Sequence, residues 1–300
     1  MADGGSEVDI REILDDANFT FEGKDYKIIQ NSKPSKETKT DFYILAKSLN
    51  DNATREFKIS YKKNTFSFVE NKVKTHRIPH IYGKNWSEIL KNQTKPLKDS
   101  FNQEVLVNFV NETIKLGWRY EIEQMDAPGI GGRSLSQKIQ QNIAPQVLWG
   151  ENCSEKMCDT LVDGKKIKNS GIPDYILIKN PDEIKTANDV FSDLQDIRNY
   201  AENHSEMRAG FIAQNYRWSF SNKKWKTEGF SRGFVVWIKW SVENKKLVGT
   251  IITDKPFEKT AGDVIENLHS CLDEMGIPYN SGSVFKTLRT RIGKTVVIKQ

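Results

Sequence analysis

The sequence predicts a mixed α/β fold, with a core sheet flanked by helices and an antiparallel β meander toward the carboxy terminus. Helix-like and strand-like patterns alternate along most of the 300 residues, whereas 208–254 holds aromatic-rich alternating runs broken by turn sequences. The chain is 37% hydrophobic and 28% charged, which is the composition of an ordinary globular protein. Its length suffices for one large domain or two smaller ones, and no apolar run approaches the roughly 18 residues of a membrane span.

Periodicity predicts a helix and several strands in the first hundred residues. Ile10, Leu14 and Ala17 recur at helical spacing and define the first helix. The expected elements, in order, are a helix over 7–17, a hairpin of 19–21 with 26–29, strands over 41–46 and 55–62, and a helix within 66–82 that ends at Pro79 and Gly83.

The rest of the chain is expected to mix both kinds of element. Val105, Phe109 and Ile114 recur near helical spacing and Gly117 is a typical helix stop, so a helix is expected over 102–116. The remaining expected elements are strands over 118–122 and 172–178, a helix over 187–203, a meander of about four strands over 208–254, a helix over 263–275 and a last strand over 295–298.

Basic residues concentrate in the last third of the chain, although the net charge is only +5. Between 208 and 239 seven bases accompany one acid, and 279–300 holds five bases and no acid. This distribution favours a polyanionic partner, because Arg and Asn can read base edges in the major groove while Lys holds phosphates. Trp237 and Trp240 are expected to be core residues instead. The residues predicted to contact DNA are Lys62, Lys63, Arg208, Asn215, Arg217, Lys223, Lys224, Lys226, Arg232, Arg289 and Arg291.

The sharpest candidate for chemistry lies in two neighbouring predicted strands. Asp41 opens the first strand, and Glu56 and Lys58 lie two residues apart inside the second. Strand alternation places Glu56 and Lys58 on one face, about 6–7 Å apart. Two carboxylates beside an ammonium suit Mg²⁺, which binds carboxylate oxygens, waters and phosphate. Such an ion lowers the pKa of a bound water, while Lys58 positions the nucleophile.

This arrangement resembles the PD-(D/E)XK nuclease superfamily, and type II restriction endonucleases in particular, over about a fifth of the chain from 19 to 82. The resemblance implies a restriction-endonuclease-like core sheet. It also implies that Asp41, Glu56 and Lys58 are catalytic, with Asp41 and Glu56 as the Mg²⁺ ligands. The residue before Asp41 is Thr40, where the family often has proline. The segment 61–72 is also similar to restriction-endonuclease-like proteins of bacteria and their phages.

The spacing of these residues sets a geometric condition. A symmetric hairpin would place Asp41 opposite Ser60, about four residues from Glu56, so convergence requires a bulge or splayed strands. The alternative is that Glu56 and Lys58 form a surface pair worth about 0.2–1 kcal/mol and have no catalytic function.

A rival site combines Asp174, which follows a proline, with Glu183 and Lys185. Asp174 lies in the strand predicted over 172–178. However, 180–183 is a turn and helix-start sequence, so Glu183 and Lys185 would lie on no strand. Asp182 and Glu183 are expected to be acids at a helix amino terminus, where the helix dipole favours them.

Three cysteines, an odd number, predict a reducing compartment and no disulfide framework. Cys153 and Cys158, together with His269 and Cys271, offer zinc-type ligands, but the pairs lie far apart in the sequence and ordinary cysteines are favoured. The glycine-rich segment 127–132 lacks the Lys-Ser/Thr of a phosphate loop, so a mobile loop is expected there. The acidic amino terminus is the opposite of a signal peptide, and a cytoplasmic location is expected.

These features predict a Mg²⁺-dependent, site-specific endonuclease that cuts double-stranded DNA and acts as a homodimer on palindromic sites. The expected organisation is a catalytic core over 1–100, a helical or mixed continuation over 101–206 and a basic, β-rich DNA-binding region over 207–300. Two alternatives remain open. One is a non-catalytic DNA-binding or phage regulatory protein, and the other is a repair or RNA nuclease of the same superfamily.

Overall fold

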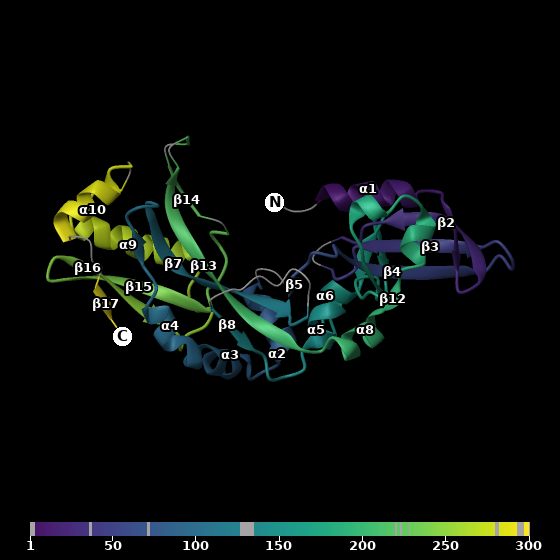
Figure 1. The fold of residues 1–300 in the computed structure, drawn as a ribbon, viewed down its shortest axis with the longest axis horizontal. Helices are drawn as coiled ribbons and strands as arrows, with labels where there is room; N and C mark the ends of the chain where they lie inside the picture. Colours follow the sequence, from purple (N-terminus) through teal and green to yellow (C-terminus); the bar gives the residue numbers. More distant parts are fainter. Residues whose placement is uncertain are drawn as a thin grey trace. The chain divides into compact units, whose positions relative to one another are not determined.

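A computed structural model describes residues 4–35, 38–70, 73–126, 135–219, 221–222, 224–227, 229–279, 282–292 and 297–299 (Figure 1). It is a strand-rich mixed α/β structure with two curled, half-barrel sheets, which confirms the predicted class. The chain divides into two compact units. Unit 1 comprises Met1–Val69, Glu123–Gly131 and Gln140–Met207, and unit 2 comprises Glu70–Ile122, Gly132–Ile139 and Arg208–Gln300. These boundaries differ from the three regions expected from the sequence.

Unit 1 is built on a mixed sheet with the order β1-β2-β3-β4-β11-β12. The first four strands pair antiparallel, and β11 then pairs parallel with β4. Its strands are β1 (Asn18–Phe21), β2 (Lys24–Ser32), β3 (Phe42–Ser48), β4 (Thr54–Lys62), β11 (Tyr175–Ile178) and β12 (Gln195–Asp196). The strands predicted over 41–46, 55–62 and 172–178 are therefore confirmed, with small shifts at their ends.

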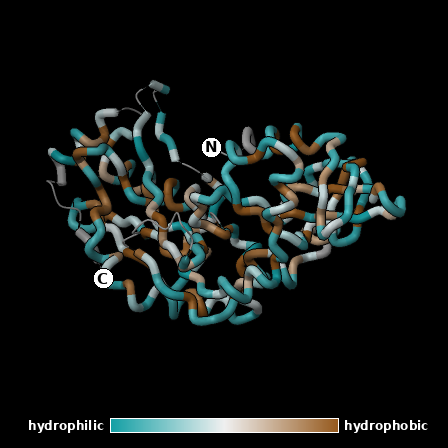
Figure 2. The backbone as a smooth tube through the Cα atoms, turned by 45° about the vertical axis from the view of Figure 1, so that its right-hand side comes forward, coloured by the Kyte–Doolittle hydropathy of each residue, from teal (hydrophilic) through white to brown (hydrophobic). Residues whose placement is uncertain are grey.

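One face of this sheet forms an apolar core with helix α1 (Gly4–Leu14). Ile10 and Leu14 of α1 are fully buried together with Phe42, Ile44 and Phe57 of the strands. This packing follows the period of two along β3 and β4, because every second side chain faces the same side. Hydrophobic stretches gather inside each unit, while hydrophilic residues mark many of the turns (Figure 2).

The remaining elements of unit 1 are short. They are α5 (Ala144–Leu148), α6 (Glu155–Cys158), β9 (Thr160–Val162), β10 (Lys165–Ile167), the 3-10 turn η3 (Pro181–Glu183), α7 (Ala187–Phe191) and α8 (Ile197–Asn203). The single helix expected over 187–203 is thus divided by β12. The division has a local cause, since the Asp196 carboxylate accepts the backbone N–H groups of Arg198 and Asn199 and caps a new helix there.

Unit 2 is built on the second sheet, in which β7 lies at the centre of the order β14-β13-β7-β15-β16-β17. The predicted meander is present as the antiparallel pairs β13–β14 and β15–β16, but β7 separates them. The strands of this order are β14 (Lys224–Lys226), β13 (Met207–Ser219), β7 (Thr113–Gln124), β15 (Val236–Glu243), β16 (Lys246–Ile252) and β17 (Val297–Lys299). Three shorter strands, β5 (Phe68–Glu70), β6 (Val107–Asn108) and β8 (Ser136–Lys138), pair with β7 or β13.

Helices and 3-10 turns precede and follow the long strands of unit 2. They are η1 (Thr75–Arg77), α2 (Ile78–Tyr82), α3 (Trp86–Thr94), η2 (Lys95–Leu97), α4 (Lys98–Asn102), α9 (Ala261–Glu274) and α10 (Val284–Ile292). The closing helix expected over 263–275 is confirmed as α9. Pro79 stands in the first turn of α2, so it begins a helix that it was expected to end.

The helix expected over 102–116 is wrong, because α4 ends at Asn102 and β7 begins at Thr113. Val105, which was expected on its apolar face, is 60% exposed. Gly117, expected to stop the helix, lies inside β7, where an added Cβ would be 2.6 Å from the carbonyl oxygen of Val236. Within the described residues, no helix is long and apolar enough to cross a membrane.

Candidate active site

The hairpin of β3 and β4 determines where the predicted catalytic residues lie. Phe42 pairs with Ile59 and Leu45 with Glu56, without a register shift along the paired residues. The Asp41 N–H donates to the carbonyl of Ile59 at 2.8 Å, so Asp41 lies opposite Ser60. Glu56 is then four residues further along β4, on the order of 13 Å away. The expected convergence of Asp41 with Glu56 is therefore not found, because the regular pairing contains none of the bulges it required.

Glu56 and Lys58 have partners of their own. The Tyr43 hydroxyl donates to Glu56 Oε1 at 2.5 Å, and burial together with this hydrogen bond raises the pKa of Tyr43. Lys58 Nζ lies 3.2 Å from Asp174 Oδ2 and donates to the carbonyl of Asn169 at 3.4 Å. Asp174 is held beside Lys58 because its N–H donates to the Lys58 carbonyl at 2.8 Å. The structure thus joins the acid of the rival site to the lysine of the first site.

Glu183 and Lys185 of the rival site do not join them. Asp182 and Glu183 lie in η3, where Glu183 completes a capping box with Asn180. This confirms the expectation that they are acids at a helix amino terminus.

Asp41 sits in a different and more perturbed setting. Its Oδ2 accepts a hydrogen bond from the Tyr61 N–H at 2.7 Å. This hydrogen bond stands in place of a backbone pair between the strands, and it holds the carboxylate in position. Burial raises the pKa of Asp41, while the Lys62 ammonium and the Tyr61 hydrogen bond oppose that rise. Two further charges act on it more weakly, Glu7 raising the pKa and Lys33 lowering it. An acid whose pKa is shifted by burial and by a specific charged neighbour is typical of functional sites.

Four charged residues therefore form what we call the Asp41 cluster: Glu7, Lys33, Asp41 and Lys62. They come from the first turn of α1, the residue after β2, the residue before β3 and the last residue of β4. Lys33 is paired with Glu7. In the sequence analysis, Lys62 belonged to the DNA contacts and Glu7 had no role. The signal that finds Lys62 is the symmetric register, which places Ser60, and hence Lys62, at the Asp41 end of β4.

The carboxylates of this cluster can be tested against a Mg²⁺ site. The pair Asp41 and Glu56 does not fit, since the register separates them. Among the residues that the structure describes, no group of three or more His, Cys, Asp or Glu side chains is placed to share a metal ion. Asp41 and Glu7 do lie close enough to affect one another, and Mg²⁺ commonly takes one or two protein carboxylates and completes its shell with water and phosphate. Asp41 and Glu7 are the two carboxylates of the cluster that could supply the protein ligands of such an ion.

A second candidate surface lies on β13 and β14 of unit 2. Arg217 pairs directly with Lys226, and both side chains are exposed. Like charges opposite one another destabilise a strand pair, so this pairing contributes nothing to the stability of the sheet. A pocket of about 390 Å³ adjoins them; its lining residues are Thr113, Arg119, Ala213, Gln214, Asn215, Arg217, Lys226 and Thr227. Asn215, Arg217 and Lys226 of the predicted DNA contacts are thus brought together. Lys224 lies at the other end of β14 and is exposed.

The other predicted DNA contacts are scattered. Arg208 pairs in register with Lys138, far along β13 from Arg217. Arg289 donates to the carbonyl of Phe109 at 3.0 Å and stacks over its ring, so it holds α10 in place. Arg232 lines a separate pocket. Lys63 follows β4 in unit 1. Lys223 lies outside the described residues, as does the side chain of Arg291.

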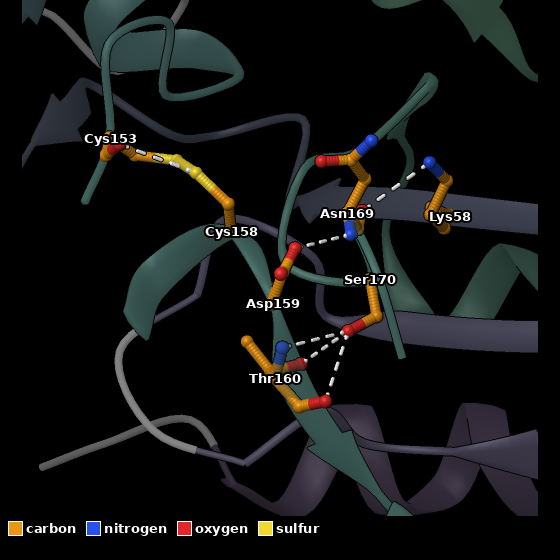
Figure 3. Close-up of a disulfide and its surroundings, with 7 residues drawn as sticks. All are labelled: Lys58, Cys153, Cys158, Asp159, Thr160, Asn169 and Ser170. Atoms are coloured by element: carbon orange, nitrogen blue, oxygen red, sulfur yellow. Dashed lines mark hydrogen bonds between the residues drawn. A yellow bond between two sulfur atoms is a disulfide. The ribbon is translucent and has the colours of Figure 1, made fainter. Parts of the chain in front are cut away.

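The cysteines differ from expectation. Cys153 and Cys158 form a disulfide, which corrects the prediction of unpaired thiols and removes both as zinc ligands (Figure 3). Cys271 is free and buried in α9. Figure 3 shows the disulfide next to Asp159, whose carboxylate accepts the N–H of Asn169 at 2.9 Å. The glycine-rich segment 127–132 lies outside the described residues. Trp237 and Trp240 are buried, as expected.

Comparison with known proteins gives no relative: no protein-family profile, no curated protein and no solved structure matches the chain.

Proposed function

We propose that this protein is a Mg²⁺-dependent endonuclease that hydrolyses phosphodiester bonds of double-stranded DNA, with the Asp41 cluster as its hydrolytic site. The observation that carries this proposal is the partly buried Asp41 carboxylate, which the Tyr61 N–H holds in place and whose pKa is raised by burial against the opposing charge of Lys62. The proposal keeps Asp41 from the sequence prediction. It replaces Lys58 by Lys62, because Lys58 is engaged with Asp174.

Each residue of the cluster has a definable task. Asp41 and Glu7 would hold the ion, and the hydrogen bond from Tyr61 N–H orients the Asp41 carboxylate before any ligand arrives. Bound Mg²⁺ supplies a water of lowered pKa and neutralises charge on the phosphate. Lys62 places a positive charge where the attacked phosphate develops negative charge, and such preorganised charge is a large contribution to catalysis.

The Arg217–Lys226 surface of unit 2 would grip the DNA. Its cations are exposed and paired side by side, which suits two neighbouring phosphates. Asn215 and Arg217 also line the adjoining pocket, where amide and guanidinium groups can read base edges. A sequence-specific enzyme of this kind would act on palindromic DNA as a homodimer.

Plasmid cleavage with Mg²⁺ tests which residues form the hydrolytic site, because Lys62 and Lys58 lie on the same strand and can be compared. We expect Asp41→Ala and Lys62→Ala to reduce the cleavage rate about a hundredfold or more, because each removes a group that acts on the transition state. Lys58→Ala, on the same strand, should retain most of the activity. The rate of supercoil loss on a gel is the measurement.

The outcomes separate the candidates. Loss of cleavage in Lys58→Ala with normal cleavage in Lys62→Ala would return the site to Lys58 and Asp174. Binding of DNA without cleavage in any divalent metal would favour the non-catalytic DNA-binding protein. Faster cleavage of RNA than of plasmid would favour the RNA nuclease.

The salt dependence of DNA affinity tests whether the Arg217–Lys226 surface binds DNA. Reversing Lys223, Lys224 and Lys226 to Glu should weaken binding to every DNA sequence and reduce the slope of log K against log salt by about 0.9 for each phosphate that the protein no longer neutralises. Truncating Asn215 or Arg217 should instead cost about 1–3 kcal/mol on the cognate site and little on random DNA. Fluorescence anisotropy at several salt concentrations measures both effects. An unchanged slope in the triple variant would show that these lysines do not touch phosphate.

A further inference from the structure

A second basic pocket lies in unit 2, away from the Arg217–Lys226 surface. Its volume is about 500 Å³, which is in the range of pockets that hold small molecules. The residues that line it belong to two segments far apart in the sequence: Lys74, Thr75, His76, Gly229, Ser231, Arg232 and Gly233. Every side chain among these described lining residues is a cation, an imidazole or a hydroxyl, so the pocket suits an anion.

The two segments lie close together where Gly233 meets Thr75. Gly233 packs so tightly on η1 that an added Cβ would lie 2.7 Å from the Thr75 hydroxyl. The 229–233 loop is anchored to the start of α9, because the N–H groups of Ala261 and Gly262 donate to the carbonyls of Arg232 and Phe230. The pocket is therefore preformed by the fold, which reduces the entropy lost when a ligand binds.

Arg232 supplies the observation that points to a ligand. The stem of its side chain lies against Gly229, where an added Cβ would be 2.5 Å from Arg232 Cδ. The Nη1 atom is buried and has no hydrogen-bond partner in the structure. A buried, charged donor without an acceptor costs free energy. Arg232 also lines the pocket, so an oxyanion bound there would accept from those guanidinium N–H groups that face the pocket.

We propose that this pocket binds the phosphate group of a nucleotide, with Arg232 as its principal anchor and Lys74, Thr75, His76 and Ser231 as further donors. Arg offers a planar set of donors that matches two phosphate oxygens. The hydroxyls of Thr75 and Ser231 can donate to the phosphate oxygens that Arg232 does not reach. The pocket is several times larger than a phosphate ion, which leaves room for the attached sugar and base. The phosphate can come from a free mononucleotide or from the end of a nucleic acid strand. The site lies in the other unit from Asp41 and does not depend on the proposed hydrolysis.

Isothermal titration calorimetry of the full chain tests the proposal with four probes: inorganic phosphate, AMP, a short DNA duplex phosphorylated at its ends and the same duplex without end phosphates. We expect Arg232→Gln and Lys74→Gln to weaken AMP binding about ten- to hundredfold, as removal of a charged hydrogen bond does. Lys246→Gln removes one exposed charge from β16 outside the pocket and should bind like the wild type. Asp41→Ala should also bind AMP normally, which separates this site from the hydrolytic one.

The probes distinguish the sources of the phosphate. Binding of AMP and inorganic phosphate that depends on Arg232 identifies a free nucleotide. Binding of only the end-phosphorylated duplex, with the same dependence, identifies a strand terminus. Equal weakening in Lys246→Gln, or no binding of any probe, would overturn the proposal. Lys74 is exposed, so its variant carries the test if Arg232→Gln does not fold.

Discussion

At the scale of single residues, the ionised carboxylate of Asp41 destabilises the folded protein at neutral pH. Burial raises its pKa above the ordinary value of 3.8. Between that ordinary pKa and the raised one, the folded protein holds a proton that the unfolded chain has already released. Stability therefore falls as the pH rises through this window, and the cost persists above it. Stability given up at one acid is common where an acid serves catalysis or binding.

We accordingly expect Asp41→Asn to raise the thermal unfolding midpoint at pH 7–8, with a gain that disappears toward pH 4. The amide oxygen of Asn can still accept the Tyr61 N–H, so only the charge is lost. Thermal unfolding followed by circular dichroism across this pH range is the measurement. Asp174→Asn is the matched control, because it breaks an ion pair with Lys58 and should give no gain. A lower midpoint for Asp41→Asn at pH 7 would contradict this account.

The assignment of Lys62 shows where prediction from sequence stops at this scale. Asp41 is identifiable from its position at the start of an apolar strand. Its partner depends on strand register, which the turn between the strands sets. The symmetric register places Lys62 near Asp41, but the sequence motif favoured Lys58. Here the structure pairs Lys47 with Thr54, and this alone decides between Lys58 and Lys62.

At the scale of secondary-structure elements, β7 explains the largest error of the sequence analysis. Nearly every residue from Ile114 to Gln124 is buried, on both faces of the strand. Its sequence nevertheless alternates apolar and polar residues from Ile114 to Glu123, which is the strand pattern. The helix was predicted instead because Val105, Phe109 and Ile114 recur near helical spacing before Gly117, and three residues at that spacing are weak evidence for a helix. β3 was predictable from the continuous apolar run over 42–46, and β4 from its alternation of polar and apolar residues.

Gly117 gives a direct test of this element. We expect Gly117→Ala to destabilise the protein by about 1–3 kcal/mol, because its Cβ would meet the Val236 carbonyl and the Phe234 ring. Lys239→Ala, at an exposed position of the neighbouring β15, should change stability by less than about 0.5 kcal/mol. Urea unfolding measures both variants. Equal stability of Gly117→Ala and the wild type would mean that β7 and β15 are not so closely packed.

At the scale of the whole molecule, the disulfide makes the stability of the protein depend on whether its surroundings are oxidising or reducing. It closes a short loop, with a sequence separation of 5 between Cys153 and Cys158. Loop-closure entropy then predicts that Cys158→Ser lowers the free energy of unfolding by roughly 2 kcal/mol.

Urea unfolding with and without reductant checks this value. Reductant should destabilise the wild type and Cys271→Ser alike, and it should leave Cys158→Ser unchanged. If reductant has no effect on the wild type, the two thiols are not joined in solution.

The parallel pairing of β11 with β4 has a consequence for how the protein is made. β4 ends at Lys62 and β11 begins at Tyr175, so more than a hundred residues separate two neighbours in one sheet. On the ribosome, that interval lasts on the order of ten seconds. During this time β4 presents an unpaired edge to the cell, and such edges attract other chains. We therefore expect chaperones to shield that edge while the chain is being made. When chaperones are depleted, the yield of folded protein should fall more steeply than that of a protein whose neighbouring strands are also close in sequence.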